Sequence, residues 1–131
     1  MAAGLEGITP EADEALARFE RAVVSAYGER LKDFVVFGSR ARGEARRESD
    51  VDVAVVLEGP IRSRFAERML LADLAYDAIV ATGVHVQPWP ITADHWRDPE
   101  GHSNPALVRA MRRDGKRYER GHVSGPVLES D

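Results

Sequence analysis

Apolar residues recur at helical and at strand spacing along the chain, and they divide it into alternating helices and strands. A Thr-Pro-Glu sequence typical of a helix start precedes apolar positions at helical spacing, which predict a helix over roughly residues 10–31. Short apolar runs at 34–37 and 51–57, each closed by glycine, predict two buried strands. A second long periodic stretch predicts another helix over roughly 63–81.

The remaining third of the chain predicts one more strand and one more helix. Residues 84–91 have the apolar character of a strand, and their two prolines confine it to a sheet edge or shorten it. Asn104 and Pro105 are typical of a helix start, so we expect a last helix through Met111, with Gly115 just beyond its end.

The order helix, strand, strand, helix, strand, helix predicts a small α/β domain in which helices cover a short mixed sheet. We expect residues 1–131 to form one domain with a core over about 10–120. Residues 121–131 are expected to be a loosely docked tail.

Composition excludes several classes of site and partner. Apolar residues make up 44% of the chain and charged residues 31%, as in ordinary soluble domains. The net charge of −4 favours neither nucleic-acid nor membrane binding, and no apolar run approaches the ~20 residues that span a bilayer. The chain has no cysteine, which excludes thiolate metal sites. The first residues lack the pattern of a signal peptide, so we expect a cytoplasmic protein.

The segment between the two central strands carries the candidate chemistry. Gly38 permits close backbone approach, and Ser39 offers a hydroxyl and an N–H group to a phosphate. Asp50 and Asp52 stand two positions apart, so their side chains share one face of the following strand. Adjacent carboxylates repel unless a cation lies between them, and carboxylate oxygens suit Mg²⁺. The segment therefore predicts a site for a Mg²⁺–nucleoside triphosphate.

Two other interpretations fit this segment less well. Gly38 and Gly43 have the spacing of a P-loop, but Glu44 follows where the phosphate-binding lysine should stand. An ordinary Gly-Ser turn followed by a solvated strand start explains each piece singly, and it explains the whole combination poorly.

The run GSRARGEARRESDVD, residues 38–52, resembles the signature of the DNA polymerase β-like nucleotidyltransferases, specifically the minimal nucleotidyltransferase (MNT) group. That signature is Gly-Ser, ten residues, then Asp-x-Asp, usually with Ala-Arg-Gly after the Gly-Ser and a serine before the first aspartate. A weaker likeness extends through GVHVQPWPITADHWRDP and NPALVRAMRRDGKRY. The resemblance thus spans most of residues 10–120.

The resemblance implies an enzyme that transfers AMP from ATP with Mg²⁺. It implies that Asp50 and Asp52 are the catalytic metal ligands. It also implies that Ser39, with the Gly38 backbone, binds the β- and γ-phosphates. The full set of nucleotide-binding positions expected on this basis is Gly38, Ser39, Arg40, Arg42 and Ser49.

The sequence departs from the family where a third carboxylate usually lies on the next strand. His85 and Gln87 share a face there, and neither is an acid. Imidazole is a poor Mg²⁺ ligand. His85 therefore either stands at the position of the third carboxylate without binding the metal as a carboxylate would, or acts as a general base. A purely structural histidine is the favoured alternative.

Three functions are compatible with this sequence. The resemblance favours an MNT antitoxin that attaches AMP to a HEPN-type ribonuclease toxin, since a chain of 131 residues leaves no room for a substrate domain. A nucleotide-binding pseudoenzyme that neutralises its partner by contact would explain the missing acid. An aminoglycoside-type nucleotidyltransferase is a third possibility.

Side chains elsewhere give weaker signals. Trp89 and Trp96 could contact a nucleotide base or a partner, although core packing is the favoured interpretation. Asp73 and Asp77 are interpreted as surface residues of a helix. The basic run on and after the last helix is interpreted as a solvated face.

Overall fold

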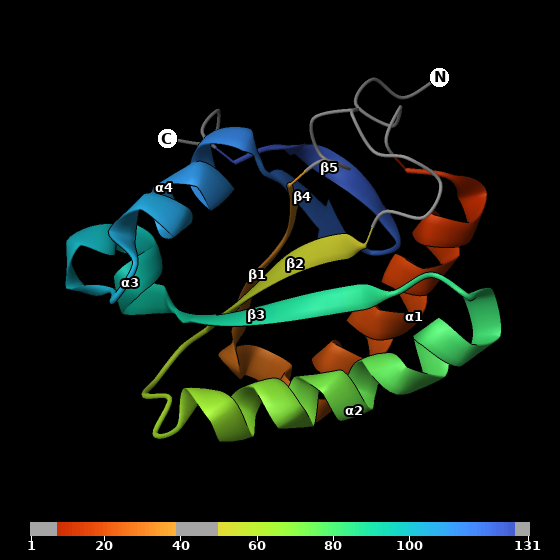
Figure 1. Ribbon diagram of the computed structural model, residues 1–131, viewed down its shortest axis with the longest axis horizontal. Helices are drawn as coiled ribbons and strands as arrows, with labels where there is room; N and C mark the ends of the chain where they lie inside the picture. Colours follow the sequence, from red (N-terminus) through yellow and green to blue (C-terminus); the bar gives the residue numbers. More distant parts are fainter. Residues whose placement is uncertain (1–7, 39–49, 128–131) are drawn as a thin grey trace.

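The fold is built on one five-stranded mixed sheet. The computed structural model describes residues 8–38 and 50–127 of the chain (Figure 1). The strand order is β3-β2-β1-β4-β5, with β2 and β3 parallel and the other neighbours antiparallel. The bounds of the strands are β1 Leu31–Phe37, β2 Val51–Leu57, β3 Val86–Thr92, β4 Lys116–Glu119 and β5 His122–Pro126. The expected mixed α/β architecture is confirmed.

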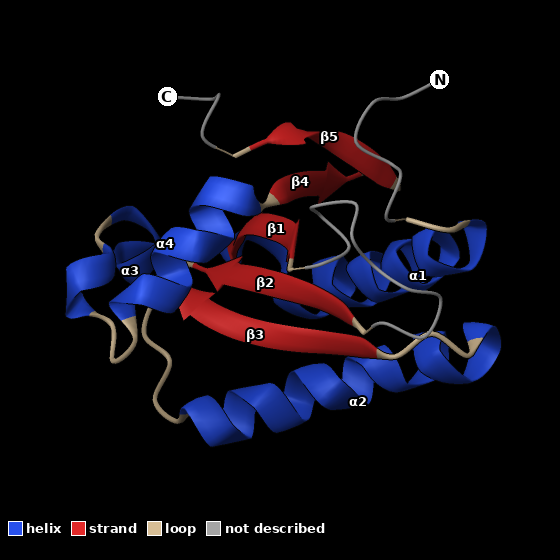
Figure 2. Ribbon diagram, turned by 45° about the horizontal axis from the view of Figure 1, so that its top comes forward, coloured by secondary structure: helices blue, strands red, loops and turns tan. Residues whose placement is uncertain are grey.

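Helices cover both faces of this sheet. The α-helices among the described residues are α1 Pro10–Tyr27, α2 Arg64–Thr82, α3 Ala93–Arg97 and α4 Pro105–Asp114, with single 3₁₀ turns η1 Gly28–Arg30 and η2 Pro99–Gly101. Helices α1 and α2 pack on one face, and α3 and α4 lie on the other (Figure 2). Within 8–38 and 50–127, no helix combines the length and apolar character needed to cross a bilayer.

The central strands are buried on both faces, which explains their nearly continuous apolar runs. In β2, Val53 and Val55 join the core beneath α1 and α2, whereas Ala54 and Val56 join the core beneath α3 and α4. Neighbouring β1 alternates in the same way, with Val36 in the first core and Val35 in the second. Burial on two sides makes any register slip between β1 and β2 costly.

The predicted helix starts are confirmed by their caps. The Thr9 hydroxyl accepts the N–H of Ala12 at 3.1 Å, and the Asn104 side chain accepts that of Leu107 at 3.3 Å. The first helix is shorter than expected, because it ends at Tyr27 and Leu31 already belongs to β1.

The third predicted strand lies at the sheet edge, as its prolines require. Among the described strands, β3 pairs with β2 alone, and Pro88 and Pro90 fall within it. Proline lacks the N–H group that a further strand would need, so these residues disfavour strand addition along this edge.

The expectation of a loose tail was wrong for residues 122–127. Strand β5 pairs with β4, and Val127 is buried beneath α4. The sequence did not predict strand β4, because its residues, KRYE, belong to a charged run. Its Tyr118 is nevertheless 1% exposed, and the hydroxyl donates to the backbone oxygen of Asp13 in α1 at 3.1 Å. Tertiary packing, which local composition does not report, orders this part of the chain.

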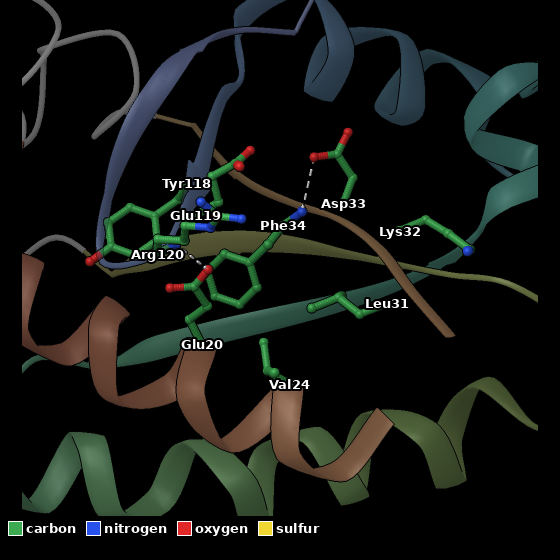
Figure 3. Close-up of a pocket in the computed structure, with 9 residues that line it drawn as sticks. All are labelled: Glu20, Val24, Leu31, Lys32, Asp33, Phe34, Tyr118, Glu119 and Arg120. Atoms are coloured by element: carbon green, nitrogen blue, oxygen red, sulfur yellow. Dashed lines mark hydrogen bonds between the residues drawn. The ribbon is translucent and has the colours of Figure 1, made fainter. Parts of the chain in front are cut away.

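A buried carboxylate fastens the β4–β5 turn to α1. Glu20 is 7% exposed, and its two oxygens accept the backbone N–H groups of Arg120 at 2.9 Å and Gly121 at 3.0 Å. Figure 3 shows Glu20 beneath this turn, at the rim of a hollow of about 220 Å³ between α1, β1 and β4. Arg120 has a positive φ of 53°, which the two bonds help to hold.

Replacing Glu20 should therefore loosen the hairpin. We expect Glu20→Ala to lower the free energy of unfolding by about 2 kcal/mol, since two N–H groups lose a charged acceptor. Glu14→Ala is the control, because the exposed Glu14–Arg18 pair should contribute under about 0.5 kcal/mol. Urea denaturation measures both values, and equal stabilities of the two variants would contradict the fastening role.

Candidate active site

Strand pairing brings the ends of the candidate motif together. Phe37 of β1 is the antiparallel partner of Asp52 in β2, and Gln87 of β3 is its parallel partner on the other side. Paired residues point to the same face of a sheet. The Phe37 ring lies in the core beneath α3 and α4, so the Asp52 side chain projects on that face.

Gly38 and Asp52 are in direct contact. Gly38 has a φ of +81°, and a Cβ atom at this position would lie 2.8 Å from Oδ2 of Asp52. Real Cβ atoms essentially never come so close to a neighbour. Any other residue would therefore both strain the backbone and displace the carboxylate. Because Gly38 has no side chain, it places no atom in the space in front of Oδ2.

Asp50 lies beside the start of β3, next to His85. Its Oδ1 is 3.6 Å from Nδ1 of His85, and both side chains are about half exposed, at 48% and 59%. The backbone oxygen of His85 accepts the N–H of Val51 at 2.9 Å, which holds the two segments together. The structure thus brings His85 to Asp50 and Gln87 to Asp52.

Trp89 also reaches the site, two positions beyond Gln87 on the same strand. Its indole Nε1–H donates to Oδ1 of Asp52 at 3.3 Å. The ring packs edge-on against Phe37, with centroids 6.2 Å apart, and the Arg68 guanidinium lies 4.5 Å from its centroid. Core packing is the favoured interpretation of Trp89 from the sequence, and its ring does pack against the core beneath α3 and α4. The period-2 alternation of β3 is the signal that could have placed it beside Asp52 as well. No sequence signal pointed to Arg68.

The environment of Asp52 disfavours its ionised form. Burial is the largest cause of a raised pKa for this carboxyl, the hydrogen bond from Trp89 lowers it, and the negative charge of Asp50 raises it further. A cation between the two carboxylates would offset both the burial and the repulsion. The donor set and the space beside Gly38 therefore fit Mg²⁺, with its ligands expected from Asp50 and Asp52.

Several of the predicted site residues do not lie within the described part of the chain. Ser39, Arg40, Arg42 and Ser49 lie outside the described residues. Trp96 is buried in the core beneath α3 and α4, as expected. Among residues 8–38 and 50–127, no group of three or more His, Asp or Glu side chains is arranged to hold a metal ion.

Comparison with known proteins identifies the family. Residues 16–110 match the family described as "Nucleotidyltransferase domain", which is more than half of the chain. The chain belongs to this family. The matched range contains the contact between Gly38 and Asp52, so the candidate site lies within the family's domain.

Two curated proteins from Methanocaldococcus jannaschii are similar to this nucleotidyltransferase domain. "Putative protein adenylyltransferase MJ1305" is 32% identical over 62 residues, which cover 47% of this chain and 42% of that protein. "Putative protein adenylyltransferase MJ0604" is 41% identical over 44 residues, covering 34% of this chain and 44% of that protein. The chain thus matches less than half the length of each of these relatives.

Solved structures share the fold. A structure described as a putative nucleotidyltransferase from Sulfolobus solfataricus matches with a TM-score of 0.55 and 23% identity, covering 94% of this chain and 97% of that one. A chain in the "Crystal structure of the toxin-antitoxin with AMP-PNP" matches with a TM-score of 0.53 and 22% identity, covering 77% of this chain and 70% of that one. At these identities the likeness shows the nucleotidyltransferase fold.

The contact between Gly38 and Asp52 makes a prediction about stability. We expect Gly38→Ala to be more destabilising than Gly83→Ala, although both glycines have positive φ values, of +81° and +76°. At Gly83 nothing lies within 4 Å of the added Cβ, so only the backbone cost of about 1–2 kcal/mol applies. Chemical denaturation of the two variants measures the difference. Equal losses would show that Asp52 moves aside freely.

Proposed function

We propose that this domain is an adenylyltransferase that uses Mg²⁺ and ATP to modify a protein, and that it is the antitoxin of a HEPN-type toxin. The observation that carries the proposal is the carboxylate pair Asp50 and Asp52 within the family's domain, in which Asp52 lies against Gly38 and Asp50 lies beside His85. The names of the two relatives support the reaction, and the toxin–antitoxin structure with AMP-PNP supports the partner and the nucleotide.

The residues of the site have separable roles in this proposal. Asp50 and Asp52 would hold Mg²⁺, which supplies charge neutralisation of the triphosphate and in-line geometry when bound. Gly38 lets the backbone approach the phosphates, and Ser39 would bind the β- and γ-phosphates. Arg40, Arg42 and Ser49 complete the proposed nucleotide-binding set.

The two residues that lie beside the aspartates at the start of β3 fit different roles. Gln87 is the strand partner of Asp52. A third carboxylate on β3 would therefore be closest to Asp52 if it stood at position 87. His85 lies beside Asp50 and is half exposed, so it can accept a proton from an incoming hydroxyl group. In this proposal His85 is a base, and Gln87 occupies the third-carboxylate position.

The exposed surface of α2 favours a protein acceptor over a small molecule. Phe65 is 75% exposed, Tyr76 and Val80 are each 64% exposed, and Met69 is 50% exposed. Exposed apolar side chains gathered along one element are typical of protein-binding surfaces. Met69 also lines a groove of about 240 Å³ that reaches His85 and Gln87 at the edge of β3. A protein bound along α2 would therefore lie next to the candidate site.

Nucleotide binding tests the metal ligands. We expect the double variant Asp50→Ala, Asp52→Ala to lose Mg²⁺-dependent ATP binding in calorimetry while it keeps its fold, because the change removes repelling charges. The matched control is Asp73→Ala, Asp77→Ala, which removes two exposed acids from α2. Unchanged affinity in the site variant would show that the ligand assignment is wrong.

Label transfer tests the reaction. With ATP labelled in its α-phosphate, Mg²⁺ and a HEPN-type toxin encoded beside this gene, we expect label on the toxin chain. Toxin inhibition without label would favour a pseudoenzyme that acts by contact. In a parallel reaction with an aminoglycoside in place of the toxin, label on the aminoglycoside would favour the small-molecule alternative.

The third-carboxylate position gives a sharper test. Gln87→Asp should add an oxygen ligand beside Asp52 and speed AMP transfer at saturating Mg²⁺–ATP, whereas His85→Ala should slow it by about 10²–10⁴-fold if His85 is the base. His85→Asp separates the role of a base from that of a metal ligand. This variant should speed AMP transfer only if the site lacks a metal ligand at position 85. Rates from single-turnover labelling measure all three variants.

A further inference from the structure

One carboxylate oxygen of Asp52 accepts a hydrogen bond from a side chain, and none of residues 8–38 and 50–127 donates one to the other oxygen. Oδ1 accepts the indole Nε1–H of Trp89 at 3.3 Å. Oδ2 points to the space beside Gly38, 2.8 Å from where a Cβ atom would stand. The hydrogen bond therefore sets the rotation of the carboxylate, because turning it would lose the bond.

The indole that makes this bond is itself fixed. Phe37 contacts the ring edge-on, at a centroid distance of 6.2 Å. The guanidinium of Arg68, from α2, lies over the ring at 4.5 Å from its centroid, a geometry in which the cation is attracted to the ring face. Contacts from β1 and α2 thus hold Trp89, and Trp89 holds Asp52.

We propose that Trp89 is a positioning residue that directs Oδ2 of Asp52 toward the cation bound with the nucleotide, and that Arg68 keeps the indole in place. This inference rests on the proposed nucleotidyltransferase function. It goes beyond that function because it gives a role to two residues outside the Gly-Ser…Asp-x-Asp signature. Residues that orient a metal ligand typically change metal affinity by about 10–100-fold when they are replaced.

The test compares metal-dependent nucleotide binding in tryptophan variants. Calorimetry of Mn²⁺–AMP-PNP should give an affinity about 10–100-fold weaker for Trp89→Phe, which keeps an aromatic ring and loses the N–H donor. Trp96→Phe is the matched control and should bind as the unmodified chain does. Trp89→His returns a ring N–H and should recover affinity, whereas Arg68→Met should weaken binding by a smaller factor.

Two further measurements separate positioning from a merely structural role. In EDTA, metal-free AMP-PNP should bind Trp89→Phe and the unmodified chain equally, because the indole acts through the cation. In the Trp96→Phe protein, Trp89 is the sole tryptophan, so its emission should change when Mn²⁺–AMP-PNP is added.

The outcomes distinguish the two proposals. Equal Mn²⁺–AMP-PNP affinities for Trp89→Phe and the unmodified chain would overturn the positioning role and leave the proposed function standing. A weakening that is the same with and without metal would overturn it as well. No binding of Mn²⁺–AMP-PNP by the unmodified chain would overturn both proposals.

Discussion

The antiparallel pairing of β1 with β2 is the constraint on which the rest of the site depends. It sets Phe37 opposite Asp52, and it thereby brings Gly38 against the carboxylate. A slip of one residue would turn Asp52 to the opposite face, away from Trp89. Because both strands are buried on two sides, such a slip would also exchange their side chains between the two cores, each of which is packed around its own set. The stability of the domain and the geometry of its site therefore have one origin.

The parallel edge strand makes the two carboxylates unequal. Asp52 is half-buried and hydrogen-bonded to Trp89, whereas Asp50 is more open and lies beside His85. Burial and repulsion raise the pKa of Asp52, so its ionised form needs a positive partner. This asymmetry suits a site where one carboxylate is held in place and the other meets solvent and an incoming group.

Helix α2 links the site to an exposed surface. Its buried side packs on α1 and the sheet, while its outer side presents apolar residues that no other described element covers. Arg68 projects from the same helix, and its guanidinium lies over the Trp89 ring. The short strands β4 and β5 complete the opposite half of the sheet, fastened by Glu20.

The sequence by itself determined the order of the main elements, the caps at Thr9 and Asn104, and the adjacent placement of Asp50 and Asp52, because these follow from local periodicity and turn chemistry. It also predicted that β3 lies at an edge, since two prolines cannot donate there. The hairpin β4–β5 and the contacts of Arg68 and Trp89 with the site were decided only by tertiary structure. Strand β4 lies in a charged run, β5 contains Ser-Gly-Pro, and no local pattern marks Arg68 as part of the site. Their positions depend on partners such as Glu20 and Asp52, which lie far away along the chain.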